Sequence, residues 1–381
     1  MVKTHFTFWF LIVALVLSSC SIEVDQPAVA TVAPTFESAP TFSSPPTNSG
    51  SQTNVVTTTQ VPVTWANLNL TGSLVYINGI SVDNVFQLQI QVLDLVTGEI
   101  TTIFNAPKYS WIYYISVSPD HTQLLMSYNP PPGDNPVDQD IYVMPLDGSR
   151  APQRLFTPPT LEDDYIEVEW SPDGKYVYFT HVNYHIPPAE GQIYPLYTIY
   201  RKALPDGEME MIAEKAYWPR VSPDSSRIAY VSVDLFSRSN KLFVADADGG
   251  NASEVVITGP RIPDIKDAPL FTADSRSLFF SADIPVQSYQ PGWLDRLMGV
   301  RVAKAHSNVP SDWWTVPVGG GEMTQLTNIQ SRGLFGSLSP DNQYLASYSL
   351  DGIFVMKTDG TQLTQLIPNP QSVPGTVSWI P

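Results

Sequence analysis

A tripeptide that recurs along the chain constrains its fold more than any other feature. Ser-Pro-Asp occurs four times and the related Thr-Ala-Asp once. These motifs end at Asp120, Asp173, Asp224, Asp274 and Asp341, and successive aspartates are 53, 51, 50 and 67 residues apart. A repeat of this length is typical of propeller blades. The spacing therefore predicts a propeller.

The segments that follow each motif come in the same order. In the first copy, a β-rich run at 124–128 is followed by another at 141–146, a turn at Asp147-Gly148 and a short final run at 153–156. Proline cannot donate a hydrogen bond within a strand and aspartate favours turns, so Ser-Pro-Asp fits a tight turn between first and second strands. Four strands per repeat make a propeller blade.

The two ends of the repeat array are each incomplete. Near the start, the β-rich segments 74–77, 89–93 and 101–104 supply a second, a third and a fourth strand but no first. At the end, residues 376–381 match residues 167–172, which belong to a first strand. Joining the two ends closes the ring and leaves no exposed central edge. The sequence thus predicts an all-β, six-bladed propeller with four-stranded blades, closed by the C-terminal strand.

One unit shows a resemblance to a known repeat most clearly. The run Val-Glu-Trp-Ser-Pro-Asp-Gly-Lys-Tyr-Val-Tyr-Phe at 168–179 resembles the WD40-like (PD40) repeat of the TolB C-terminal propeller and of the propellers in prolyl oligopeptidase relatives. The resemblance covers about 70–381 and implies a TolB-like propeller. It implies no single function, because this repeat serves many tasks. TolB's first domain has no counterpart here, so the TolB partners Pal and TolA are not expected.

The first twenty residues have the layout of a secretory signal. Lys3 precedes an apolar run at 6–17, which is followed by Ser18 and Ser19. The run has about a dozen residues, whereas a membrane-spanning helix needs roughly 20. The segment 17–20, Leu-Ser-Ser-Cys, resembles the lipobox of bacterial lipoproteins, which implies lipid attached to Cys20. Cys20 is the sole cysteine and has no disulfide partner in the chain.

We therefore expect an extracytoplasmic lipoprotein attached to a bacterial membrane through lipid on Cys20. A permanent membrane anchor and an ordinary signal peptide that ends in a buried thiol are the alternatives. Residues 21–64 are rich in Ser, Thr, Pro, Ala and Val with few charges, a composition that favours a disordered stalk. The expected domains are a signal peptide at 1–20, a stalk at 21–64 and a propeller at 65–381.

Composition and missing motifs exclude several classes of function. The net charge of −17 repels nucleic-acid phosphates, so nucleic-acid binding is not expected. Gly-x-Ser-x-Gly, His-Glu-x-x-His, paired cysteines and Gly-x-x-x-x-Gly-Lys do not occur. We therefore predict no catalytic residue, no metal and no cofactor. The protein is expected to be a monomer.

Two patterns offer alternative metal sites. His181 and His185 with Glu190 could hold a metal, but both histidines follow a strand into a proline-bearing loop, and we interpret them as surface residues. The segment 246–251, Asp-Ala-Asp-Gly-Gly-Asn, is similar to calcium-binding loops. Because it coincides with the third-to-fourth strand turn of the repeat, we interpret it as a turn.

Loop lengths distinguish the two faces of the predicted ring. The first-to-second and third-to-fourth turns of a blade lie on one face, which we name the tight-turn face because these turns are uniformly short. The other connections lie on the long-loop face, with long segments at 129–139, 183–195, 234–240 and 283–311. Long loops on one face usually mark a binding side. Within the last segment, 293–306 has an apolar helical stripe that predicts either packing on the domain or partner recognition.

These features favour a non-catalytic propeller that binds or scaffolds a protein, peptide or glycan through its long-loop face. The side chains selected by this interpretation are Tyr184, His185, Tyr194, Tyr289 and Trp293. The alternative is an extracytoplasmic glycan lyase or hydrolase with acidic residues at the propeller channel. Its candidates are Asp163, Asp164 and Glu190.

Overall fold

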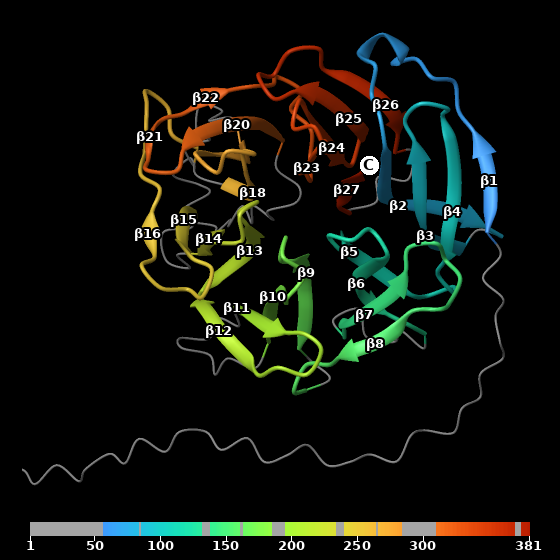
Figure 1. Cartoon of the computed structure of the whole chain (residues 1–381), viewed down its shortest axis with the longest axis horizontal. Coiled ribbons are helices and arrows are strands. Elements are labelled where there is room, and N and C mark those ends of the chain that lie inside the picture. The colour runs from blue at the N-terminus through green and yellow to red at the C-terminus, as the bar shows by residue number, and fades with distance from the viewer. Residues whose placement is uncertain are drawn as a thin grey trace, which may run out of the picture. The chain divides into compact units, whose positions relative to one another are not determined.

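The described strands form six blades around a central axis (Figure 1). The computed structural model describes residues 56–83, 85–131, 138–160, 163–184, 195–233, 240–263, 266–283, 310–369 and 375–381. Six candidate residues lie outside these ranges: Cys20 for lipidation, His185, Tyr194, Tyr289 and Trp293 for binding, and Glu190 of the alternative metal and enzyme sites. Within the described ranges, no helix is long and apolar enough to cross a membrane.

The first three blades show the predicted strand order, with one additional outer strand in blade 1. Blade 1 contains β1 (Thr57–Gln60), β2 (Ser73–Val82), β3 (Val85–Asp94), β4 (Glu99–Asn105) and β27 (Val377–Ile380). Blade 2 contains β5 (Trp111–Val117), β6 (Gln123–Asn129), β7 (Asp140–Pro145) and β8 (Gln153–Phe156). Blade 3 contains β9 (Asp164–Trp170), β10 (Tyr176–Asn183), β11 (Leu196–Ala203) and β12 (Met209–Glu214). The first strand of each repeat is the innermost one (Figure 1).

The other three blades repeat this order. Blade 4 contains β13 (Ala216–Val221), β14 (Arg227–Val233), β15 (Asn240–Asp246) and β16 (Ser253–Glu254). Blade 5 contains β18 (Lys266–Phe271), β19 (Ser277–Asp283), β20 (Ser311–Pro317) and β22 (Thr324–Gln325). Blade 6 contains β23 (Phe335–Leu338), β24 (Tyr344–Ser349), β25 (Gly352–Lys357) and β26 (Thr364–Pro368). A short parallel pair, β17 (Ile257–Thr258) and β21 (Gly321–Glu322), links blades 4 and 5. The predicted all-β, six-bladed fold is confirmed.

Each Ser-Pro-Asp motif forms the turn between the first and second strands. Ser118 Oγ donates to Asp120 Oδ1 at 2.5 Å and accepts from the backbone N of Gln123 at 2.9 Å. The next residue, His121, has a φ of 57°. The hydrogen bond from Ser118 lowers the pKa of Asp120, and the equivalent bond from Ser222 helps lower the pKa of Asp224 to about 2. The carboxylates of these aspartates therefore accept hydrogen bonds within their own turns.

The glycine turns between third and fourth strands have a second role, in blade packing. A Cβ atom at Gly148, where φ is +70°, would lie 2.6 Å from the carbonyl oxygen of Ile103 in the preceding blade. The same close approach joins Gly249 to Ile212, Gly320 to Val256 and Gly360 to Leu326. Glycine is required here because any side chain would push neighbouring blades apart.

The C-terminal strand closes the ring, as predicted. β27 pairs antiparallel with β2, placing Trp379 opposite Leu74. The indole N–H of Trp379 donates to the Thr71 carbonyl at 2.9 Å, and its side chain is buried. At Gly72, with φ of +80°, a Cβ atom would lie only 2.2 Å from the Ile380 carbonyl oxygen. The two ends of the propeller therefore meet in one sheet.

The folded part begins earlier than the sequence indicated. Residues 57–60, assigned to the disordered stalk, form β1 and pair antiparallel with β4 at the outer edge of blade 1. All four side chains are exposed, so the strand is held by backbone hydrogen bonds rather than by apolar burial. Trp65 then fixes the following segment, because its buried indole N–H donates to the Leu95 carbonyl at 2.8 Å. A prediction based on apolar alternation could not detect such a strand.

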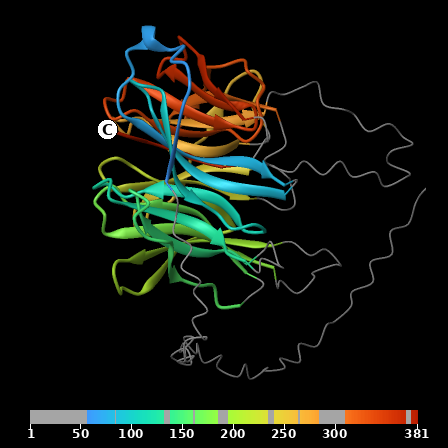
Figure 2. The same cartoon turned by 90° about the vertical axis from the view of Figure 1, so that its right-hand side faces the viewer.

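The tight-turn face and the long-loop face lie at opposite ends of the strands. Figure 2 shows the blades edge-on, with the chain end at one side and the blue β2–β3 hairpin reaching toward the opposite side. The Ser-Pro-Asp turns belong to the side of the chain end, because Pro381 follows β27 where these turns follow the other inner strands. The tight-turn and long-loop faces are thus opposite ends of the channel.

Candidate functional site

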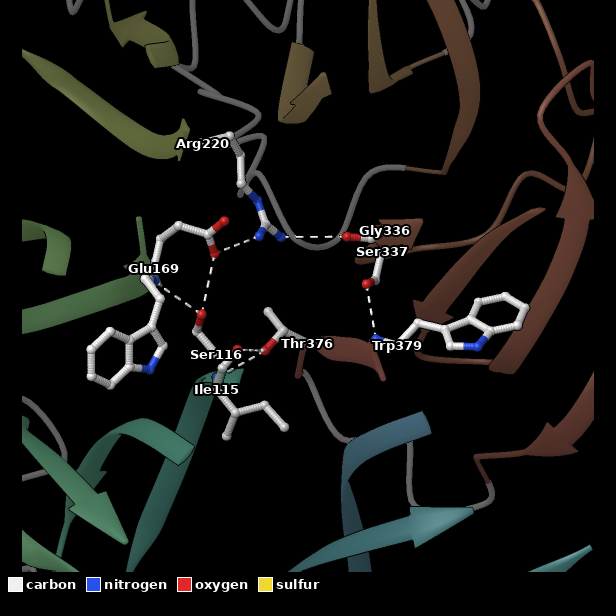
Figure 3. Close-up of polar contacts among 9 residues, drawn as sticks. Ile115, Ser116, Glu169, Arg220, Gly336, Ser337, Thr376 and Trp379 are labelled. Atoms are coloured by element: carbon white, nitrogen blue, oxygen red, sulfur yellow. Dashed lines mark hydrogen bonds and ion pairs between the residues drawn. The ribbon is translucent and has the colours of Figure 1, made fainter. Parts of the chain in front are cut away.

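Polar side chains from several blades meet at the centre of the ring. Arg220 of β13 contacts Glu169 of β9, with 2.7 Å between Nη1 and Oε2, and its Nη2 donates to the Gly336 carbonyl of β23 at 3.5 Å (Figure 3). Ser116 of β5 donates to the same Glu169 oxygen at 3.5 Å. Burial raises the pKa of Glu169, and the Arg220 guanidinium opposes this rise. These contacts join four blades across the axis.

Side-chain hydroxyls also join the inner strands of neighbouring blades. Thr376 Oγ1 accepts from the backbone N of Ile115 at 2.9 Å and donates to its carbonyl at 3.1 Å (Figure 3). Ser337 Oγ accepts from the backbone N of Trp379 at 2.9 Å. Both contacts involve the residues around β27, so they reinforce the closure of the ring.

Three aromatic rings pack together beside this polar layer. The ring centroids of Tyr114, Trp218 and Phe335, from blades 2, 4 and 6, are 5.3, 4.7 and 6.4 Å apart. Trp218 has a φ of 57° and lies in a β-bulge that follows Tyr217. A bulge changes the direction of a strand's side chain, and here it directs the Trp218 ring against its two partners. We name these three residues the channel plug.

A buried carboxyl group lies next to the channel plug. Glu167 accepts hydrogen bonds of 2.6 Å from Thr180 Oγ1 and from the backbone N of Trp218. Burial raises the pKa of Glu167 to about 8, despite these two hydrogen bonds. Sequence reasoning missed Glu167, although a glutamate alternating with apolar residues in an inner strand is the signal that could have identified it.

A group of four aspartates lies between blades 2 and 3, at the strand ends of the long-loop face. These residues, which we name the acidic cluster, are Asp138, Asp140, Asp163 and Asp164. Asp140 Oδ2 is 2.9 Å from Arg154 Nε, and Asp164 Oδ1 accepts from the backbone N of Gln139 at 2.9 Å. Burial raises the pKa values of Asp140 and Asp164 to about 6.

Four residues singled out in the sequence come together at this cluster. His181 Nε2 lies 3.0 Å from Asp163 Oδ2, and the Tyr184 hydroxyl donates to Asp164 Oδ2 at 2.9 Å. The candidates His185, Glu190, Tyr194, Tyr289 and Trp293 fall outside the described residues. The structure therefore brings together part of the binding set and part of the enzyme set.

The described residues of the two possible metal sites have other hydrogen-bond partners. Within the described ranges, no three histidine, cysteine, aspartate or glutamate side chains are arranged to hold a metal ion. In the turn at 246–251, Asp246 Oδ2 accepts from Asn251 Nδ2 at 2.6 Å and Asp248 Oδ1 accepts from the backbone N of Gly250 at 2.9 Å. These oxygens stabilise the turn itself.

Three aromatic side chains that the sequence analysis did not select form a row that reaches the acidic cluster at Tyr113. Phe86, at the β2–β3 hairpin, has its ring 6.1 Å from that of Trp111, and Trp111 is 6.0 Å from Tyr113 with an interplanar angle of 8°. We name these three residues the aromatic row. Phe86 is 37% exposed and the other two are partly exposed. Asp164 adds to the effect of burial in raising the pKa of Tyr113, so its charge acts on this end of the row.

A cavity of about 460 Å³ lies elsewhere, between blades 4 and 5 on the tight-turn face. Its lining includes Arg227, Asp246, Asn251, Ser275 and Arg276. The Arg227 guanidinium has partners within the protein, because it donates to the Ser275 carbonyl and lies over the Phe271 ring. The cavity is separate from both the acidic cluster and the aromatic row.

Comparisons with known proteins agree with this architecture. Neither the models of protein families nor the curated proteins include a match to the sequence. Among solved structures, TolB from Acinetobacter baumannii is similar, with a TM-score of 0.54 and 16% identity over 81% of this chain and 66% of that one. The fold is that of a TolB-like six-bladed β-propeller.

Two other solved structures are similar in fold. A putative TolB from Agrobacterium tumefaciens matches with a TM-score of 0.51 and 17% identity over 82% of this chain and 99% of that one. A chain in a nidogen/laminin complex matches with a TM-score of 0.55 and 9% identity over 80% of this chain and 97% of that one. This chain spans just under two thirds of the Acinetobacter TolB. At such low identities the TolB-like propeller is a statement about fold.

Proposed function

We propose that this TolB-like propeller is a non-catalytic binding protein that holds a protein, peptide or glycan ligand on its long-loop face. The aromatic row is the observation that supports this proposal most. Aromatic side chains dominate binding energy at interfaces, and a partly exposed group of them on a ring face is a suitable contact surface. On the tight-turn face, the polar side chains of the Ser-Pro-Asp turns form hydrogen bonds within the turn, as Ser118 does with Asp120.

Photo-cross-linking in cells tests which face binds the ligand. A photoreactive phenylalanine analogue is placed at Phe86 on the long-loop face, or at the exposed Ser149 on the tight-turn face. We expect ultraviolet light to give a discrete adduct from position 86 and none from position 149. Adducts from position 149 alone would assign the ligand to the tight-turn face.

We further propose that the propeller is carried outside the cytoplasmic membrane by lipid on Cys20. The support is the Leu-Ser-Ser-Cys segment after an apolar run, together with the absence of a second cysteine. Cells fed a labelled fatty acid should produce labelled protein, and Cys20→Ala should abolish the label. A Cys20→Ala protein that still carries lipid would disprove the anchor.

A glycan lyase or hydrolase is the second candidate, because Asp164 has a pKa of about 6. A carboxyl group with such a pKa suits proton transfer near neutral pH. Binding is preferred because Asp163 is 1% exposed and both Asp164 oxygens accept hydrogen bonds within the protein. Release of reducing ends or unsaturated products from a panel of bacterial polysaccharides, lost in Asp164→Asn, would favour the enzyme.

A further inference from the structure

The acidic cluster holds more negative charge than its described basic neighbours neutralise. Arg154 contacts Asp140 at 2.9 Å and His181 contacts Asp163 at 3.0 Å. Among the described residues, Asp164 is hydrogen-bonded to Gln139 and Tyr184, neither of which is cationic. Buried carboxylates without cationic partners are costly, so a ligand that brings positive charge would be stabilised here.

The same cluster also lacks hydrogen-bond donors. Asp163 Oδ1 and Gln139 Oε1 are buried and have no hydrogen-bond partner in the described structure. Asp163 is 1% exposed and Gln139 is 3% exposed. Because a buried acceptor without a donor costs free energy, these two oxygens add to the negative potential of the cluster, which a positively charged group on the neighbouring exposed rings would offset. Ammonium and guanidinium groups combine several donors with positive charge.

The aromatic row supplies a contact surface for such a cation. The rings of Trp111 and Tyr113 are nearly parallel and partly exposed, and Phe86 continues them to the hairpin. A cation over an aromatic face is attracted to the ring, while the methylene stem of lysine or arginine packs against it. The negative charge of Asp164, which acts on both Tyr113 and Tyr184, strengthens this attraction.

We propose that the long-loop face recognises a lysine- or arginine-rich segment of a partner protein, whose cations rest on the aromatic row in the field of the acidic cluster. This inference rests on the proposed function and adds the chemistry of the ligand. The net charge of −17 favours a basic partner and repels an acidic one. A neutral glycan would use the rings but would bring no positive charge to Asp164, whose described partners are neutral.

Fluorescence anisotropy of the full chain with a labelled lysine–glycine decapeptide tests the inference. A glutamate–glycine decapeptide and a neutral oligosaccharide are the comparison probes. Asp164→Asn and Asp120→Asn are matched variants, because each removes one negative charge but they lie on opposite faces. We expect saturable binding of the lysine peptide that Asp164→Asn weakens about tenfold and Asp120→Asn leaves nearly unchanged. Added salt should weaken binding.

A second variant keeps the inference testable if Asp164→Asn folds poorly. Trp111→Leu removes a partly exposed ring and should weaken lysine-peptide binding by a similar factor, with thermal melting as the check on folding. Equal losses in Asp164→Asn and Asp120→Asn, or no saturable lysine-peptide binding, would overturn the inference. Saturable binding of the neutral oligosaccharide alone would also overturn it. The proposed function is judged separately, by the cross-links from position 86.

Discussion

At the scale of single residues, the inner strands carry side chains that are poorly suited to an apolar core. Glu167 is 6% exposed, and its carboxyl group lies beside the aromatic rings of the channel plug. Its neighbour Glu169 is ion-paired with Arg220, whereas the described donors to Glu167, Thr180 Oγ1 and a backbone N–H, are neutral. Burial raises the pKa of both glutamates, and Glu169 differs in being ion-paired with Arg220.

The free energy of unfolding should fall with rising pH because of Glu167. Its pKa is about 8 in the folded protein and 4.5 in the unfolded chain, so the native state holds a proton that the unfolded state has lost. The stabilising contribution is complete below pH 4.5 and is lost as pH rises through 8. Glu167→Gln should match the original protein at pH 5 and exceed its stability at pH 9, on the order of a few kcal/mol.

Urea unfolding between pH 5 and pH 9 measures this effect. Glu169→Gln is the control, because it removes the carboxylate that pairs with Arg220 and should destabilise the protein near neutral pH. Parallel stability profiles for Glu167→Gln and the original protein would show that Glu167 does not titrate in this range.

At the scale of elements, the repeat predicted most of the strands because each blade buries alternating apolar residues between the same turns. β27 was recognised from its match to another inner strand, and its pairing with β2 follows from ring closure. β1 was missed because its four side chains are exposed. The parallel pair of β17 and β21 was also missed, because two-residue strands carry no periodic pattern.

Closure of the ring should depend on Gly72. Gly72→Ala and Gly174→Ala both place alanine at positive φ, +80° and +71°, which costs about 1 kcal/mol. Only Gly72→Ala also drives a Cβ atom to within 2.2 Å of the Ile380 carbonyl oxygen, whereas Gly174 has open space. We expect Gly72→Ala to lower the melting temperature by several degrees more than Gly174→Ala. Equal shifts in melting temperature would mean that β27 accommodates the added methyl group without a cost in free energy.

At the scale of the whole molecule, the sequence predicted the six-bladed ring but did not predict which residues come together at the candidate site. Ser-Pro-Asp turns recur because every blade needs the same turn, so they identify the architecture. The acidic cluster combines residues from both sides of the interface between blades 2 and 3, and nothing local to Asp138 or Asp164 announces their proximity. The aromatic row was missed for the same reason, since Phe86 and Trp111 belong to different blades.

Hydrogen–deuterium exchange of the full chain shows whether the ligand binds on the long-loop face. Exchange is measured with and without saturating lysine–glycine decapeptide. We expect slower exchange at the β2–β3 hairpin around Phe86 and at the start of β5, with no change at the Ser-Pro-Asp turn of Asp120. Slower exchange at the Asp120 turn, with none at the hairpin, would contradict binding on the long-loop face.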